Sequence, residues 1–401
     1  MSDENSTRLD ALIRSPFARL ATLLEGIKPG AEPINLSLGE PRASLPPFLG
    51  PILEEHLNAF GRYPPIKGIP ALRQSIAKWL SRRYPALQDA IDPERHVLPL
   101  NGSREGLFSA VFPACARKPG IGEPVVLIPN PFYQVYAAAA GAAGATPMFL
   151  TAGPETGFLP DLNAIDEAVL NRTVALYLCS PSNPEGAVAS PDYLAKAIQL
   201  ARRHDFLLFA DECYSEIYGD EPPPGAIEIA ESQTRSLANV VAFQSLSKRS
   251  GLPGLRSGFA AGDPAFMGAY FRFRNVACPQ VPLPLQHVSA AAWADEAHVE
   301  EARGLYRANF DSADVILNGR YGFRRPAGSF FLWLNMAGFG GGEAAATTLW
   351  KGCGVKVLPG AYLTHAQPDG ANPGQDFIRV ALVHDAETTR EALGRIVATL
   401  G

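Results

Sequence analysis

The chain has 401 residues, enough for two or three domains at about 150 residues each. Hydrophobic residues make up 47% and charged residues 19%, which excludes a disordered chain. The 35 Lys and Arg against 40 Asp and Glu give a net charge of −5, and no long basic tract is present. A nucleic-acid partner or an anionic membrane surface therefore has no electrostatic support.

The five cysteines are scattered and include no C-x-x-C pair, and the seven histidines show no metal-ligand spacing. This pattern argues against a disulfide framework and against a metal site, and it suits a reducing cytosol. The first seven residues are polar and acidic, unlike a signal peptide. No run approaches the ~18 apolar residues of a membrane span, so we expect a cytoplasmic protein.

The middle of the chain alternates short apolar runs with helical patterns. The runs cover residues 125–128, 146–150, 174–179, 206–210 and 240–243, and the clearest helical stretches cover 103–116 and 192–204. Runs that are apolar at every position are typical of strands covered on both faces. The alternation predicts an α/β fold with a mostly parallel sheet and helices on both faces.

The last hundred residues follow another pattern. A long helix is expected over about 285–317, and the runs 330–334, 355–358 and 377–382 predict strands of a second, smaller sheet. We therefore expect a large domain over residues 45–300. A smaller α+β domain is expected from both chain ends, residues 1–44 and 301–401.

Residues 245–258 directly follow the apolar run 240–243 and place Lys248 at the carboxyl end of a predicted strand. Open α/β sheets bind their ligands at this edge. Ser245 and Ser247 flank the lysine, and Arg256 follows eight residues later. A Ser-x-x-Lys match alone is also compatible with a surface lysine in a Gly/Pro loop.

The whole segment resembles the lysine segment of class I pyridoxal-phosphate aminotransferases, which have fold type I. The resemblance implies that Lys248 forms the Schiff base with pyridoxal 5′-phosphate, while Ser245 and Arg256 bind its phosphate. Ser257 departs from the family, where an apolar residue usually follows the arginine.

Asp211 ends the apolar run 206–210, and Tyr214 follows three residues later. A carboxylate at the edge of a sheet is costly unless it has a cationic partner. The resemblance implies that Asp211 keeps the pyridine nitrogen of the cofactor protonated and that Tyr214 binds its phenolic oxygen. The alternative is an acid that caps the following helix.

Residues 180–186 read Ser-Pro-Ser-Asn-Pro-Glu-Gly, which by composition is a turn. The family has an S-P-x-N-P-T-G loop here, which implies that Asn183 binds the phenolic oxygen and also lines the substrate pocket. Glu185 stands where the family has Thr, so the local charge differs. Family members also carry cis peptides that match Pro131 and Pro184, and we expect both here.

The remaining cofactor candidates lie in three other segments. Gly102, Ser103 and Arg104 open a predicted helix, whose free N–H groups suit a phosphate, although most such starts are ordinary caps. The resemblance implies that Tyr133 stacks on the pyridine ring; the alternative is a core aromatic. It also matches Tyr63 to a tyrosine that reaches the phosphate of the neighbouring subunit, which implies a homodimer with shared active sites.

Arg379 lies inside an apolar run, where a guanidinium is costly unless it is paired. Its planar fork fits a carboxylate in two-point contact. The resemblance implies that Arg379 binds the α-carboxylate of the substrate and that Gly39 lines the same pocket.

Several stretches, among them 101–105, 211–218, 253–259 and 358–363, are similar to the succinyldiaminopimelate aminotransferase branch of the family. This implies amino transfer between glutamate/2-oxoglutarate and N-succinyl-2-amino-6-oxopimelate/N-succinyl-LL-diaminopimelate, in lysine and diaminopimelate biosynthesis. The distal acidic groups of that substrate call for a second cation, for which the candidates are Arg42, Lys67, Arg249 and Arg274.

Two other hypotheses about the enzyme's reaction stay open. One is another class I aminotransferase, acting on dicarboxylic, aromatic or small amino acids. The other is a pyridoxal-phosphate-dependent β-lyase on the same fold. A binding module that merely retains the fold is disfavoured, because it does not need Lys248, Asp211 and Arg379 together.

Overall fold

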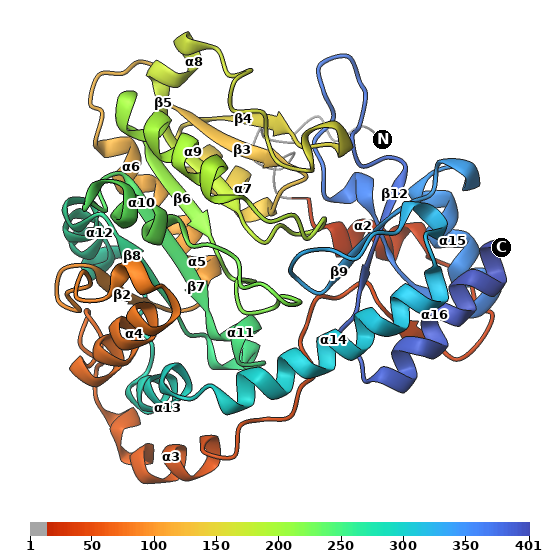
Figure 1. The fold of residues 1–401 in the computed structure, drawn as a ribbon, viewed down its shortest axis with the longest axis horizontal. Helices are drawn as coiled ribbons and strands as arrows, with labels where there is room; N and C mark the ends of the chain where they lie inside the picture. The colour runs from red at the N-terminus through yellow and green to blue at the C-terminus, as the bar shows by residue number, and fades with distance from the viewer. Residues whose placement is uncertain (1–13) are drawn as a thin grey trace.

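The computed structural model describes residues 14–401, so the polar N-terminal segment considered above lies outside the described residues. A seven-stranded sheet forms the centre of the larger part of the molecule (Figure 1). Its order is β2 (Val97–Leu100), β8 (Gly258–Gly262), β7 (Val240–Ser245), β6 (Leu207–Asp211), β5 (Thr173–Cys179), β3 (Val125–Asn130) and β4 (Thr146–Thr151). β8 is antiparallel to both its neighbours, and the other pairs are parallel.

Six of the seven strands are buried on both faces, as apolar runs predict, and the edge strand β4 is only partly buried along its whole length. In β6, Leu208 and Ala210 belong to one hydrophobic core, while Leu207 and Phe209 belong to another. This division follows from the alternation of side chains along a strand. The five strands expected between residues 125 and 243 are all confirmed.

Helices cover both faces of this sheet. The first core includes residues of α4 (Pro70–Arg83), α9 (Pro191–Arg203), α10 (Ala226–Thr234) and α13 (Leu283–Ala294). The second includes residues of α5 (Ser103–Ser109), α6 (Val111–Ala116), α7 (Gln134–Ala142) and α12 (Pro264–Ala277). Shorter or peripheral helices are α3 (Leu49–His56), α8 (Glu167–Arg172) and α11 (Leu246–Arg249).

Two expected helices are divided in the structure. The stretch 103–116 forms α5 and α6, separated at Ala110, because Pro113 has no N–H to donate to the preceding turn. The helix expected over 285–317 is α13 followed by α14 (Ala297–Leu317). Asp295 between them is extended (φ −93°, ψ 135°), and its carboxylate accepts a hydrogen bond from the N–H of His298 (3.1 Å).

A smaller layer is built from both ends of the chain. The antiparallel sheet β11 (Leu358–Pro359), β12 (Phe377–Ala381) and β9 (Phe331–Asn335) packs with α14, α15 (Gly342–Cys353) and α16 (Ala386–Leu400). Near the N-terminus, β1 (Ile34–Asn35) pairs in parallel with β10 (Val355–Lys356), and α2 (Pro16–Leu23) contacts β11. The single strand expected over 355–358 is wrong, because β10 and β11 belong to different sheets.

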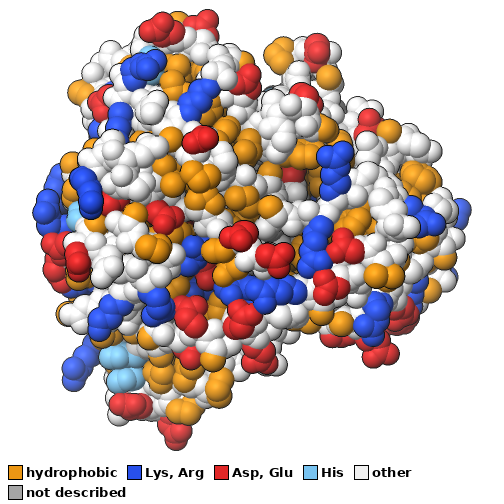
Figure 2. Space-filling model, viewed as in Figure 1, with side chains coloured by type: hydrophobic (Ala, Val, Ile, Leu, Met, Phe, Trp, Pro, Cys, Tyr) orange, Lys and Arg blue, Asp and Glu red, His pale blue; other side chains and the backbone are white. Residues whose placement is uncertain are grey.

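α14 connects the two parts of the molecule. It begins next to α13 and runs diagonally upward to α16 in Figure 1. The domain boundary expected at residue 300 falls in its first turn and stays a prediction. Acidic and basic side chains are interspersed over the face shown in Figure 2. Within residues 14–401, no helix is long and apolar enough to cross a membrane.

Candidate active site

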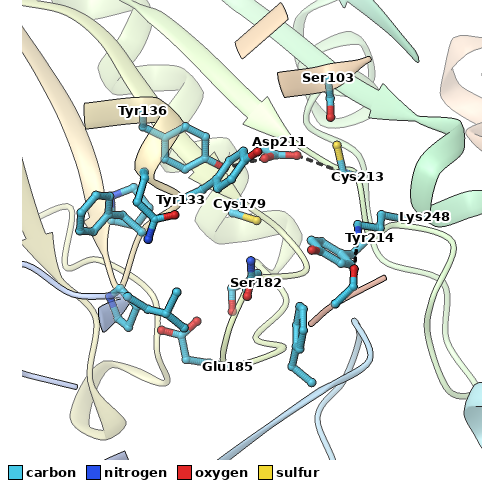
Figure 3. A pocket seen from close by; sticks show the side chains of 18 of the residues that line it. Ser103, Tyr133, Tyr136, Cys179, Ser182, Glu185, Asp211, Cys213, Tyr214 and Lys248 are labelled. Atoms are coloured by element: carbon cyan, nitrogen blue, oxygen red, sulfur yellow. Dashed lines mark hydrogen bonds between the residues drawn. The ribbon is translucent and has the colours of Figure 1, made fainter. Parts of the chain in front are cut away.

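A cavity of about 380 Å³ opens at the carboxyl ends of β5, β6 and β7 (Figure 3). Most of the residues predicted for the site lie on its wall: Gly39, Ser103, Arg104, Tyr133, Asn183, Asp211, Tyr214, Ser245, Lys248, Arg256 and Arg379. Segments from both parts of the molecule therefore form one cavity.

Lys248 lies in α11, the short helix that directly follows β7. Its amine donates a hydrogen bond to the carbonyl oxygen of Gly39. The ammonium lies 5.4 Å from the ring centre of Phe330 and 5.8 Å from that of Tyr214. Burial lowers the pKa of Lys248 to about 8. A lysine with such a pKa has an appreciable fraction of free amine near neutral pH, which suits a nucleophile or a base.

Asp211 is the last residue of β6 and is buried at the inner end of the cavity. The hydroxyl of Tyr136 donates to its Oδ2 (2.5 Å), and the N–H of Cys213 donates to its Oδ1 (3.2 Å). Burial raises the pKa of Asp211; these hydrogen bonds and the charge of Lys248 oppose that effect without outweighing it. A cationic group placed in the cavity would stabilise this carboxylate.

Gly102 and Arg256 form one end of the site. Gly102 has φ +83°, and a Cβ built on it would lie 2.4 Å from Nη2 of Arg256, so only glycine allows this close approach. Arg256 also donates to the carbonyl of Pro253 (2.8 Å). Ser245 caps α11 by accepting from the N–H of Ser247 (3.1 Å). This end of the site therefore brings together the N-terminus of α5, the hydroxyls of Ser103 and Ser245, and the guanidinium of Arg256. Such a set of donors suits an anion.

Tyr133 follows β3, and its ring enters the cavity beside Asp211 (Figure 3). Its hydroxyl accepts a hydrogen bond from Nε of Arg104 (2.7 Å), and burial raises its pKa. Tyr63, in contrast, is fully exposed and does not lie on the wall of this cavity. Its expected contact is with a second subunit, so that contact stays a prediction.

Arg379 extends from β12 into the other end of the cavity. Its Nη1 donates to Oδ1 of Asn183 (2.9 Å), and its Nη2 donates to the carbonyl of Ser37 (2.8 Å). Its guanidinium lies 4.2 Å from the ring centre of Phe331, and burial lowers its pKa to about 10. Nε of Arg379 is buried and has no hydrogen-bond partner within residues 14–401. An additional acceptor such as a carboxylate would satisfy it.

The two residues that depart from the family pattern, Ser257 and Glu185, lie in different environments. Ser257 is fully buried, and the hydroxyl of Ser289 in α13 donates to its hydroxyl (2.8 Å), so a polar residue fits there. Glu185 lies on the wall of the cavity itself. The expected cis peptides before Pro131 and Pro184 are present, and a third precedes Pro181.

The four cations suggested for the distal acidic groups do not lie on this wall. Arg249 binds Glu296 (2.7 Å) and the carbonyl of Ala292 (2.6 Å), and Arg274 pairs with Glu105. Lys67 donates to the carbonyl of Glu94 (3.3 Å), and Arg42 contacts Nδ1 of His384 (3.2 Å). None of the four therefore lines the cavity of its own chain, and the suggestion that one of them binds the distal acidic groups stays a prediction.

Sequence reasoning missed some residues of the site. Tyr136 is the third residue of α7, and its ring lies edge to face against that of Tyr133, with ring centres 5.7 Å apart. Tyr133 precedes the helix with an extended backbone, so no helical spacing indicates this pair. Pro16 and Phe17 of α2 also line the cavity. No local pattern indicates this, because it depends on the tertiary fold.

A lysine of lowered pKa, a buried acid and an anion cradle, placed at the carboxyl ends of a mostly parallel sheet, define a pyridoxal-phosphate-dependent enzyme of fold type I. The model of the family "Aminotransferase class I and II" matches residues 31–396. The chain therefore belongs to the class I and II aminotransferase family, and its cofactor is pyridoxal 5′-phosphate.

Three relatives illustrate the similarity. An LL-diaminopimelate aminotransferase of Desulforudis audaxviator is 32% identical to this chain. The alignment spans 100% of this chain and 99% of that protein. The structure of an aminotransferase from Neisseria meningitidis has 37% sequence identity and a TM-score of 0.91; the match spans 98% of this chain and 99% of that one. A probable N-succinyldiaminopimelate aminotransferase of Thermus thermophilus has 26% identity and a TM-score of 0.81, with coverages of 96% and 100%.

The described residues fit this cofactor. Gly102 leaves space where a side chain would strike Arg256, next to donors suited to a phosphate. Asp211 is a buried acid that a protonated ring nitrogen would stabilise. Lys248 offers an amine of lowered pKa between these two ends.

Proposed function

We propose that the chain is a transaminase that moves an amino group between the glutamate/2-oxoglutarate pair and an amino acid of the diaminopimelate type. One observation carries the proposal. Lys248, Asp211 and Arg379, from three elements far apart in the sequence, meet at one cavity beside an anion cradle. Each of the three is costly to bury without the partner that this reaction provides.

In this proposal Ser103, Ser245 and Arg256 bind the phosphate of the cofactor, together with the backbone of Gly102. Tyr133 covers one face of the ring. Asp211 holds a proton on the ring nitrogen, with Tyr136 fixing the orientation of its carboxylate. When bound, pyridoxal phosphate supplies an electron sink that makes the α-hydrogen of an amino acid acidic.

Substrate binding and proton transfer are assigned to three further residues. Arg379 binds the α-carboxylate, and its contacts to Asn183 and Ser37 fix the direction of its guanidinium. This contact orients the breaking bond. The amine of Lys248, whose pKa burial lowers to about 8, would take the α-proton and deliver it to the aldehyde-derived carbon of the cofactor, and it would move a proton in the opposite direction in the second half of the reaction. Tyr214 binds the phenolic oxygen of the cofactor.

Two substrates of the diaminopimelate type are supported by different observations. The sequence stretches quoted above, together with the Thermus relative, favour N-succinyl-LL-diaminopimelate. The LL-diaminopimelate aminotransferases at 31–32% identity favour the free amino acid. Homodimer formation and a cytoplasmic location complete the proposal.

The experiment is a product assay on the cofactor-loaded enzyme. We expect LL-diaminopimelate plus 2-oxoglutarate to give glutamate, and a parallel reaction with N-succinyl-LL-diaminopimelate ranks the two donors. No product is expected when 2-oxoglutarate is left out. Release of ammonia without an oxo acid would instead indicate a lyase, and no product from either donor would refute the diaminopimelate assignment.

A further inference from the structure

Glu185 is an acidic residue on the cavity wall to which the proposed reaction gives no role. It lies in the loop between β5 and α9, two residues after Asn183. The loop is closed by hydrogen bonds from the N–H of Ser182 to the carbonyl of Ala187 (2.8 Å) and from the N–H of Gly186 to the carbonyl of Ser182 (3.1 Å). The Glu185 side chain therefore starts from a well-defined backbone.

The carboxyl group of Glu185 projects into the cavity, away from the side where Lys248 lies (Figure 3). Its polar neighbours are its own N–H and the hydroxyl of Ser182, and no Lys, Arg or His within residues 14–401 pairs with it. Burial is the largest influence on it and raises its pKa to about 8. The wall of the same cavity also includes the apolar side chains of Phe158, Leu159 and Pro160.

The other charged side chains of the cavity have a use in the proposed reaction or, like Arg104, which donates to the hydroxyl of Tyr133, a partner. Arg256 faces the phosphate end, Asp211 the ring nitrogen, and Arg379 the α-carboxylate end. Glu185 is the acid that remains. It is half-buried, and an acid in such a place without a cation is costly when ionised; a cationic or hydrogen-bond-donating ligand group reduces that cost.

We propose that Glu185 forms a subsite for the ammonium group at the distal end of the substrate side chain. The inference rests on the proposed transamination and deepens it. LL-Diaminopimelate carries a distal ammonium, whereas its N-succinyl derivative has an uncharged amide in that position. Glu185 therefore selects the free amino acid over its acylated form and over amino acids that lack the second amino group.

The test compares LL-diaminopimelate with L-2-aminopimelate, which has the same chain and both carboxylates but no distal amino group. The cofactor absorbance of the holoenzyme is followed while each amino acid is added alone, which gives kcat/KM for the half-reaction. Wild type is compared with Glu185→Gln, which keeps the shape, and with Glu185→Thr, which restores the usual family residue. Glu301→Gln on α14, an exposed acid, is the matched control.

We expect the preference of the wild type for LL-diaminopimelate over L-2-aminopimelate to fall about 10- to 100-fold in both Glu185 variants and to stay unchanged in Glu301→Gln. An unchanged ratio in both variants would overturn the subsite, and so would a wild type that reacts with glutamate but not with LL-diaminopimelate. A wild type that reacts with none of the amino acids would instead refute the proposed function. Reaction with glutamate shows that each variant is folded.

Discussion

At the scale of single residues, the account depends on how the fold treats the amine of Lys248. It is buried against aromatic rings and bound to a backbone carbonyl, and no carboxylate pairs with it within residues 14–401. An amine in such a place is held in a reactive state, since burial favours its neutral form. A lysine needed only for structure would be expected to pair with an acid or to reach the solvent.

Replacing Lys248 by Ala removes the amine and leaves the phosphate end of the site intact. We expect turnover to fall by more than about 10³-fold while pyridoxal phosphate still binds without a covalent bond. Lys351→Ala, which changes an exposed lysine of α15, should keep wild-type turnover. Turnover of Lys248→Ala within tenfold of the wild type would contradict its role.

The pKa of Lys248 gives a prediction about pH. Only the neutral amine reacts with the cofactor aldehyde, so the rate of cofactor attachment to the apoenzyme should rise with pH. Since burial lowers this pKa to about 8, the rise should level off above about pH 8. The measurement is the rate at which the visible absorbance appears between pH 6 and 10, with Nα-acetyl-lysine as reference for an ordinary amine of pKa about 10.4. A midpoint like that of the reference would contradict the prediction.

At the scale of elements, the loops that follow the strands position the chemistry. The loop after β5 carries both Asn183 and Glu185, and it ends at Gly186 with φ +71°. A Cβ on Gly186 would lie 2.4 Å from Cβ of Pro326 and 2.5 Å from the carbonyl oxygen of Gly328. The loop is thus fitted against the segment that leads into β9.

Gly186→Ala should therefore destabilise the protein by about 1–3 kcal/mol through the positive φ and the clash with Pro326. The free energy of unfolding in urea measures this. Gly144→Ala is the matched control, because Gly144 also has a positive φ (+75°) but nothing lies within 4 Å of its added Cβ. If Gly186→Ala loses no more stability than Gly144→Ala, the proposed clash between the added Cβ and Pro326 is wrong.

Local patterns in the sequence predict some features of the fold and miss others. Continuous apolar runs such as 174–179 are typical of strands buried on both faces, and the structure confirms them. The break between α13 and α14 was missed because neither Asp295 nor Glu296 is a strong helix breaker; it depends on the tertiary position of Asp295.

In the site, too, local sequence patterns predict some features, and others depend on the tertiary fold. Lys248, Asp211 and Arg379 can be selected from motifs, but the contact of Lys248 with Gly39 joins residues 209 positions apart. Arg249 and Arg274 lie near motifs in the sequence, yet their side chains turn to Glu296 and Glu105. Sequence proximity to a motif does not determine on which side of an element a side chain lies.

At the scale of the whole molecule, the exposed Tyr63 bears on the proposed homodimer. Tyr63 is 100% exposed and contributes nothing to the core of its own chain, so its side chain is free to contact a second copy of the chain. We propose a homodimer in which Tyr63 reaches the phosphate of the neighbouring site.

Sedimentation equilibrium should therefore give twice the mass of the chain. Tyr63→Phe should raise the Kd for pyridoxal phosphate about tenfold, through the loss of a hydrogen bond to a charged group. Tyr321→Phe, far from the cavity wall, is the control and should bind the cofactor like the wild type. A fully active monomer would contradict this arrangement.

The central claim is that the cavity formed by Lys248, Asp211 and Arg379 performs the first half of a transamination. The most direct test is the visible spectrum of the purified, cofactor-loaded protein while glutamate alone is added. We expect the absorbance of the lysine-bound cofactor to be lost as 2-oxoglutarate forms in equal amount. A spectrum that glutamate leaves unchanged, in a protein that binds the cofactor, would contradict the account.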